Sequence, residues 1–384
     1  MPTFFIGDLL TGRRIQFLQP LAGSWSEAVN DAGDVSVTVS LRNRAMRNLR
    51  LANSAAVGKA FLAVAEGETI LQAGPIWDHD WDRDTGKLTL RGAGLLSYFD
   101  HRTLLPVLAG RLPSDATTDT RFMPAAPADP DYPWPTDTRS SLQGIMVSLF
   151  AQALSWPSGN VPLTLPSIIA GTSQRPYRGA DLAPVGQRVR EITQVSDGPE
   201  VRLTPQWLTD KSGISWLAEI GTPTQPLLFS NRRQVFYIGN DKSSVTKLRA
   251  NVNGKSMGSQ AYAAGGRSSD KTLTTVSTNA ALTNAGYPLL ELVDSSRSTI
   301  QDLATLQTVS DELVARGATP VSTWNFTHDL QSEPYLTSFR AGDFAEVRVI
   351  DDAYLEKKAY VMRILSRSTD VRGKKVDLIM GPAV

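Results

Sequence analysis

The chain has 384 residues, of which 41% are hydrophobic and 20% charged, so it can bury large cores and should form about two to four domains. Lys and Arg number 39 against 38 Asp and Glu, which leaves no global charge to favour nucleic acid, and the absence of cysteine excludes disulfides and thiolate chemistry. No apolar run approaches the ~18 residues of a membrane span, and the N-terminus lacks a secretory signal, so we expect a protein that is made in the cytoplasm and leaves it, if at all, by a signal-independent route.

The first part of the chain, 1–105, predicts a β domain. Residues 25–41 predict a hairpin with its turn at 31–33, because apolar and polar residues alternate strictly along 34–41. Four arginines follow within ten residues, and we interpret them as a solvated or salt-bridged surface rather than a nucleic-acid site: Arg42, Arg44, Arg47 and Arg50.

A second hairpin is the centre of the stretch 61–106. Its strands are 76–82 and 87–91, and the turn contains Asp84 and Gly86, a strong hairpin signal between alternating residues. One face carries the tryptophans and the other the aspartates. We therefore predict that four apolar residues of this hairpin belong to the core of the first domain: Trp77, Trp81, Leu88 and Leu90.

The aspartates of this hairpin are the best metal candidates, since alternate carboxylates can converge on calcium in a curled loop. They are Asp78, Asp80, Asp82 and Asp84. Counted as an EF-hand from Asp78 or Asp80, however, the series lacks both the sharp-turn glycine and the bidentate glutamate. This favours a solvent-facing row paired with Arg and Lys, although a bound cation at 78–84 stays open. The three histidines have no paired ligand spacing, which argues against zinc: His79, His101 and His328.

The middle of the chain predicts an insert and an α+β region. Seven prolines in 106–135 indicate a linker or interaction loop, within a proline-rich insert at 106–175. This insert contains one helix, capped by Ser140 or Ser141, with a buried face formed by Leu142, Ile145, Met146, Leu149, Phe150 and Ala153. Region 176–240 predicts a helix capped by Asp181, with an apolar edge of Leu182, Val185, Val189 and Ile192, followed by strands at 200–208, 214–217 and 234–238.

The remainder, 241–384, predicts a second β domain holding one helix. A strand is expected at 245–252, and 265–270 should be flexible because it is rich in Gly and Ser. The helix is expected at 299–316, with Ser298 and Gln301 at capping-box spacing, an apolar face of Ile300, Leu303, Leu306 and Leu313, and Gly317 as C-cap. Strands follow at 322–327, 344–350, 359–365 and 375–380. The fold class is therefore mainly β, with an α+β middle region.

No catalytic constellation emerges from the sequence. Residues 213–217 begin like a nucleophile elbow but lack its closing glycine, and 254–256 lack the first glycine of a phosphate-binding loop. Carboxylate pairs for glycoside hydrolysis stay open, but nothing marks one pair. Most of the eight tryptophans lie in strand-like segments and are expected in cores or interfaces. Trp134, between two prolines, is expected to be a contact residue. We predict no enzyme and no catalytic, cofactor-binding or metal-binding residues.

The order of these segments resembles the baseplate-hub or tail-tip hub proteins of long-tailed bacteriophages, especially minor tail proteins of actinobacterial phages. The segments that carry the resemblance, in chain order, are the 25–41 hairpin, the 74–76 strand with its Asp-rich partner, the 95–106 exit, 177–205 with its Gly198-Pro199-Glu200 turn, the 298–317 helix, and Arg340-Ala341-Gly342-Asp343. They span nearly the whole chain, as weak motifs without one diagnostic signature.

The resemblance implies a structural virion protein. It implies a homotrimer in which two β-barrel-like hub domains per subunit form a pseudo-sixfold ring between the tail tube and distal tail protein above and the tip below. DNA would pass through the lumen, and the partners would be the distal tail protein, the tape measure protein and tip or receptor-binding proteins. Because the chain stops at Val384 soon after its last strand, a lysin would be a separate protein. The alternatives are a phage cell-wall hydrolase and a carbohydrate-binding adsorption protein.

Overall fold

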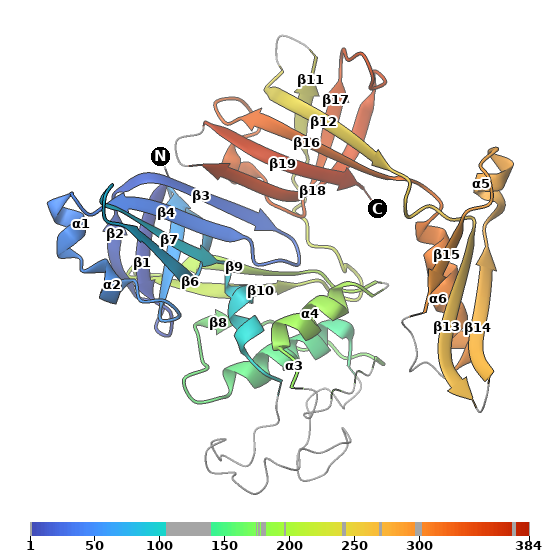
Figure 1. Ribbon diagram of the computed structural model, residues 1–384, viewed down its shortest axis with the longest axis horizontal. Coiled ribbons are helices and arrows are strands. Elements are labelled where there is room, and N and C mark those ends of the chain that lie inside the picture. The colour runs from blue at the N-terminus through green and yellow to red at the C-terminus, as the bar shows by residue number, and fades with distance from the viewer. Residues whose placement is uncertain are drawn as a thin grey trace, which may run out of the picture. The chain divides into compact units, whose positions relative to one another are not determined.

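The computed structural model describes residues 2–104, 140–173, 175, 177, 182–195, 197–239, 243–268, 271–295, 302–370 and 374–383. The chain separates into two compact units, one formed by Met1–Thr246 with Phe326–Ile379 and the other by Lys247–Asn325 with Met380–Val384 (Figure 1). The proline-rich stretch 106–135 and Trp134 lie outside the described residues. None of the described helices is long and apolar enough to cross a membrane.

The chain contains a thirteen-stranded, mainly antiparallel sheet, most of whose strands belong to the first unit, and this confirms the mainly β prediction. The order is β12-β16-β19-β18-β3-β4-β7-β6-β5-β1-β2, with β17 beside β18 and β11 beside β17. Among the described residues this order does not close into a barrel. The strands are β1 (Thr3–Asp8), β2 (Arg14–Leu18), β3 (Pro20–Ala28), β4 (Asp34–Ser40), β5 (Ala60–Glu66), β6 (Thr69–Asp82), β7 (Lys87–Ala93), β11 (Gln234–Ile238), β12 (Val245–Asn253), β16 (Val321–Asp329), β17 (Phe344–Val349), β18 (Ala359–Asp370) and β19 (Lys375–Pro382).

The predicted N-terminal hairpin is confirmed as β3 and β4. Val35, Val37 and Val39 are buried, as their alternation with polar residues indicated. The arginine-rich segment that follows forms two short helices, α1 (Arg44–Asn48) and α2 (Leu51–Ser54), anchored by the buried Met46 and Leu51. Strands β1 and β2 were not predicted.

The second predicted hairpin is confirmed as β6 and β7, with Asp82 opposite Lys87. Leu88 and Leu90 are buried as predicted, but the prediction that Trp81 lies in the core is wrong, because it is 48% exposed. The register of β6 shifts between Ile76 and Asp78, and beyond this bulge the strand leaves the core, so its alternation no longer separates inside from outside.

Helices of the first unit pack on the core beneath the sheet. The 3-10 helix η1 (Leu95–His101) follows β7, and α3 (Leu142–Leu154) is capped by Ser141, whose hydroxyl accepts from the Gly144 N–H. The predicted start of the next helix is wrong. Helix α4 (Val185–Thr193) begins after Pro184, which takes the N-cap position, so Leu182 stays outside it and 60% exposed. Asp181 lies outside the described residues.

A three-stranded sheet, in the order β8-β10-β9, packs against the same core. It consists of β8 (Leu163–Thr164), β9 (Val201–Trp207) and β10 (Ile214–Ile220), which confirms the two longer predicted strands. Trp216 of β10 is 1% exposed and meets Phe61 of β5 edge to face, with ring centroids 5.7 Å apart. This contact fixes the small sheet on the large one.

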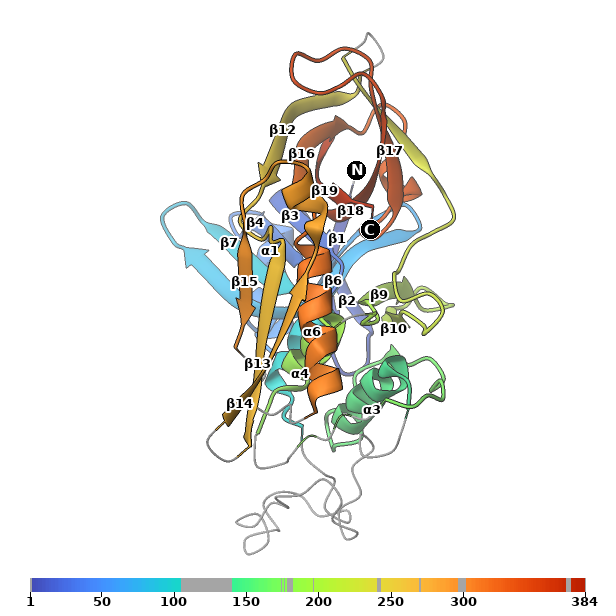
Figure 2. The ribbon, with the colours of Figure 1, turned by 90° about the vertical axis from the view of Figure 1, so that its right-hand side faces the viewer.

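The second unit places helix α6 (Leu303–Arg316) along a sheet ordered β14-β13-β15 (Figure 2). Its other elements are β13 (Gln260–Ser268), β14 (Lys271–Thr278), α5 (Ala280–Asn284) and β15 (Glu291–Asp294). The prediction of a flexible 265–270 is wrong for 265–268, which belong to β13. There a register shift between Ala264 and Arg267 accommodates the glycines.

The predicted start of α6 is also wrong. Asp302 is the N-cap, since its carboxylate accepts from the Thr305 N–H, while Ser298, Ile300 and Gln301 lie outside the described residues. Gly317 is the C-cap as predicted. Leu306 is buried but Leu303, which lies in the first turn, is 56% exposed.

Candidate functional site

The hairpin aspartates, the best metal candidates in the sequence, are engaged with other side chains. Arg91 of β7 forms ion pairs with both Asp78 and Asp80, and each of these three side chains is about half exposed. Asp82 instead stabilises its own turn, since hydrogen bonds from Thr85 and the Asp84 N–H lower its pKa. Within the described ranges, no group of three or more His, Asp or Glu side chains could hold a metal ion.

The three histidines lie in separate structural contacts. His79 contacts the Ala55 carbonyl oxygen at 2.6 Å, and the His101 ring lies against the half-buried Trp77, with centroids 4.4 Å apart. His328 is fully buried between the Ser244 hydroxyl and the Pro334 carbonyl. Its burial lowers the pKa, partly offset by the bond to Pro334. The structure therefore brings none of them beside another.

The strongest gathering of charge lies inside the first unit, where β3 meets β18. Glu27 and Arg367 are cross-strand partners in this antiparallel pair, so their side chains share one face. The Glu27 carboxylate accepts from Nε of Arg367 at 2.6 Å and from Nη2 of Arg340 at 3.0 Å. Glu27 is 5% and Arg367 2% exposed. We call these residues, with Arg202 and Glu219, the charge network.

Arg202 and Glu219 join the charge network from the small sheet. They lie opposite each other on β9 and β10, and Nε of Arg202 is 2.9 Å from the Glu219 carboxylate. Arg340 connects the two halves, because it also donates to the Thr204 hydroxyl at 3.1 Å, and Thr204 in turn bonds Glu219. The two sheets of the first unit are thus joined by ionic as well as apolar contacts.

The charge network holds the loop 336–343 in place. Arg367 donates through Nη1 to the carbonyls of Leu336 and Phe339, and Arg202 donates to that of Ala341 at 2.6 Å. Buried loop carbonyls need such donors because water cannot reach them. The Asp343 carboxylate accepts from two backbone N–H groups, those of Ser230 and Arg340.

A second buried ion pair lies beside the same loop. Arg363 of β18 binds Glu200 through both terminal nitrogens, and both side chains are under 10% exposed. Glu200 also accepts from the Leu228 N–H at 2.8 Å, and Arg363 donates to the Gly342 carbonyl at 2.9 Å. The pair thereby satisfies the polar groups that its burial would otherwise leave unpaired.

Burial alone would raise the pKa of Glu27, but Arg367, Arg340 and Arg202 outweigh it and lower that pKa to about 2. Because the folded pKa lies below the ordinary 4.5, this carboxylate stabilises the fold above about pH 4.5 and loses that contribution as the pH falls toward 2. The difference corresponds to about 3 kcal/mol.

This predicts a specific acid sensitivity. Denaturant unfolding of the parent and of Glu27→Gln between pH 6 and pH 3 should show a steeper loss of stability in the parent, because the variant lacks the titrating group. The variant should be less stable than the parent at pH 6. Parallel pH profiles for the two proteins would contradict the assignment.

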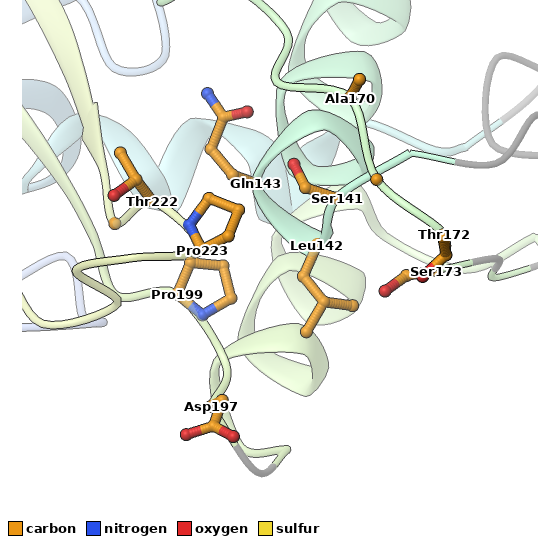
Figure 3. A pocket seen from close by; sticks show the side chains of 12 residues that line it. Ser141, Leu142, Gln143, Ala170, Thr172, Ser173, Asp197, Pro199, Thr222 and Pro223 are labelled. Carbon is orange, nitrogen blue, oxygen red and sulfur yellow. The ribbon is translucent and has the colours of Figure 1, made fainter.

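A cleft of about 260 Å³ lies at the N-terminal end of α3 (Figure 3). Gln143 contributes to it but is satisfied by the Ser167 carbonyl and the Ile169 N–H. Its described lining also includes Pro199, Pro223 and Thr222, and Asp197 is the one titratable residue among these described residues. No imidazole, amine or second carboxylate accompanies Asp197 in this described lining, so these residues form no general acid–base pair.

Sequence reasoning missed Glu27, Arg202 and Arg367. In β18, Arg363 and Arg367 lie on the face opposite the buried Ile364, so alternation alone indicates surface charges although both are buried. A buried charge requires a buried partner. The partner itself could not be identified, since Glu27 lies 340 residues away in the chain.

No protein-family model and no curated protein sequence matches this chain. Among solved structures, a tail protein from Neisseria meningitidis MC58 is similar with a TM-score of 0.57 and 12% identity, over 99% of this chain and 97% of that one. The 43 kDa tail protein of prophage MuSo2 from Shewanella oneidensis also gives 0.57, at 10% identity, over 100% and 98%. Prophage tail protein gp18 from Listeria monocytogenes EGD-e gives 0.52, at 9% identity, over 99% and 94%. At these identities the likeness shows a shared fold.

Proposed function

We propose that this chain is a structural protein of a phage tail, located in the baseplate or tail tip of the virion, and that it is not an enzyme. The observation that carries the proposal is the extent of the likeness. Three proteins described as tail or prophage tail proteins share the fold over at least 99% of this chain and at least 94% of their own. The resemblance found in the sequence points the same way.

The finer proposal is a homotrimeric hub of the actinobacterial-phage type. Two β-barrel-like domains per subunit, 1–105 and 241–384, would form a ring that joins the tail tube and distal tail protein to the tip and lets DNA pass. The insert 106–175 and the α+β region 176–240 would lie between them. Further partners would be the tape measure and tip or receptor-binding proteins. The charge network supports a scaffold role, because buried ion pairs that join two sheets favour one fixed arrangement of a subunit's wall.

Two experiments test the two levels of this proposal. Antibodies against the chain should label the tail tip of intact particles, which tests the location. Native mass measurement of the purified chain, alone and mixed with the distal tail protein of the same phage, should give a multiple of three subunits, which tests the ring. Tip labelling with a strictly monomeric chain that joins no ring would retain the location and reject the trimer.

The alternatives predict different outcomes. A zone cleared on host peptidoglycan by the purified chain, and lost on substitution of one carboxylate, would identify a cell-wall hydrolase. Saturable binding of the chain to host cells that is lost on substitution of Trp134 would identify a carbohydrate-binding adsorption protein. We expect neither result.

A further inference from the structure

An open groove of about 370 Å³ adjoins the charge network in the first unit. Strand β9 contributes one side of it, including Thr204, Gln206 and Trp207, and Thr337 comes from the 336–343 loop. Arg340 and Arg367 line it as well. Its size lies within the range of small-ligand sites, and seven of its ten described lining residues are polar.

Arg367 brings unsatisfied donors to this groove. A guanidinium has five N–H donors and no acceptor. The Nε of Arg367 donates to the Glu27 carboxylate, and its Nη1 donates to the carbonyls of Leu336 and Phe339. Nη2 makes no hydrogen bond to any residue that the structure describes, although the side chain is 98% buried. The nitrogen that remains available on a buried arginine therefore belongs to a residue that lines an open groove.

Arg340 adds a second donor. Its Nε and Nη2 bind Glu27, whereas Nη1 forms an ion pair with the Glu219 carboxylate at 3.6 Å, too long for a hydrogen bond, and so keeps its N–H donors. Its side chain is 32% exposed, so solvent or a ligand can reach it. The two arginines are held by Glu27, which fixes their guanidinium groups beside each other.

The charge of the lining favours an anion. The three arginines of the charge network, Arg202, Arg340 and Arg367, stand against two carboxylates, those of Glu27 and Glu219. Glu68, the one carboxylate among the described lining residues, is itself paired with Lys211 at the surface. Asp343, the other acidic residue beside the 336–343 loop, already accepts hydrogen bonds from two backbone N–H groups. Burial lowers the pKa of Arg367, and although Glu27 raises it, Arg340 and Arg202 lower it further. One additional negative charge would relieve this repulsion.

We propose that the groove binds a carboxylate, which accepts hydrogen bonds from Nη2 of Arg367 and Nη1 of Arg340. Planar carboxylates match guanidinium donors well. A single negative charge matches the one positive charge left over in the charge network, whereas a phosphate dianion would exceed it. Thr337, an exposed residue of the lining, supplies a further donor through its hydroxyl. The carboxylate can be that of a free small acid or of an acidic side chain in an extended peptide. The proposal does not depend on the tail function.

The test is thermal unfolding of the full chain with sodium acetate and sodium chloride at equal ionic strength, followed by calorimetric titration. Acetate should raise the unfolding midpoint saturably, since a ligand of the folded state stabilises it by mass action, and chloride should not. A capped peptide with one glutamate, compared with its glutamine twin, distinguishes the sources. Tighter binding of the glutamate peptide than of acetate indicates an acidic partner segment, and equal binding indicates a small acid.

Variants locate the site. Arg340→Gln should abolish the acetate response, while Arg367 still pairs with Glu27. Thr337→Val changes an exposed residue and should not disturb folding, and it should weaken the acetate response. Arg91→Gln is the matched control, because it removes an arginine charge from an exposed ion pair with Asp78 and Asp80, none of which lines the groove, and it should keep the response. An equal effect of chloride, or a response unchanged in both Arg340→Gln and Thr337→Val, would overturn the proposal.

Discussion

Replacing Arg367 by methionine should lower the free energy of unfolding by about 3–5 kcal/mol, the range for breaking a buried ion pair from one side. Methionine keeps much of the apolar volume, so the loss is electrostatic. Glu27 would remain buried with only the partly exposed Arg340, and the carbonyls of Leu336 and Phe339 would lose their donor. Denaturant unfolding at neutral pH measures the effect.

Arg91→Met is the matched control for Arg367→Met. Arg367 pairs with one carboxylate and Arg91 with two, those of Asp78 and Asp80, but Arg91 and both aspartates are about half exposed. Solvent-exposed ion pairs are weakened by water and salt. The unfolding midpoint of the Arg91→Met variant should therefore stay close to that of the parent. Equal losses in the two variants would show that burial does not govern the charge network.

A double variant separates pairing from packing. Glu27→Gln with Arg367→Met removes both charges, so it should be more stable than the sum of the single losses predicts, because neither partner is left as an uncompensated buried charge. Strict additivity would contradict a direct interaction between these two residues.

Truncating Trp216 to alanine should destabilise the first unit by about 3–5 kcal/mol, as large buried aromatics do on removal. Its ring fills the contact between β10 and β5 against Phe61, and its Nε1 donates to the Ala73 carbonyl at 3.2 Å. Loss of the ring leaves a cavity and an unpaired carbonyl at once. Thermal or denaturant unfolding measures the change.

Trp81→Ala is the control for Trp216→Ala, because it removes a tryptophan that is partly exposed instead of buried. Trp81 lies near the end of the β6–β7 hairpin and is 48% exposed. Removing it should leave stability nearly unchanged, since little apolar surface returns to water. A large loss at Trp81 together with a small one at Trp216 would reverse the assignment of the core.

Local patterns predicted most strands and helices of this fold correctly. Val35, Val37 and Val39 identify β4 by alternation, and Gly317 identifies the end of α6. Errors arose where geometry departs from ideal periodicity. The bulge at Ile76 places Trp81 in solvent, and Pro184 begins α4 later than Asp181 indicated. These departures depend on tertiary packing, which a local pattern does not contain.

The charge network could not be predicted, for a different reason. Its members are separated by long stretches, as in Glu27 with Arg340 and Glu27 with Arg367. Each looks like an ordinary surface charge within its own segment. Only the pairing of β18 with β3 gives Arg367 and Glu27 a common face. The composition showed a nearly neutral chain, and the fold decides which of its charges are buried.

The pairing of β3 with β18 also bears on how the protein is made. A ribosome releases Glu27 and its strand long before it reaches Arg367, 340 residues later. Until then β3 lacks the neighbour that covers one of its edges, and Glu27 lacks its closest cation. The free edge of β3 therefore stays exposed, and can pair with other chains, until β18 has been synthesised and pairs with it. Chains that end before β18 would therefore keep this edge of β3 unpaired.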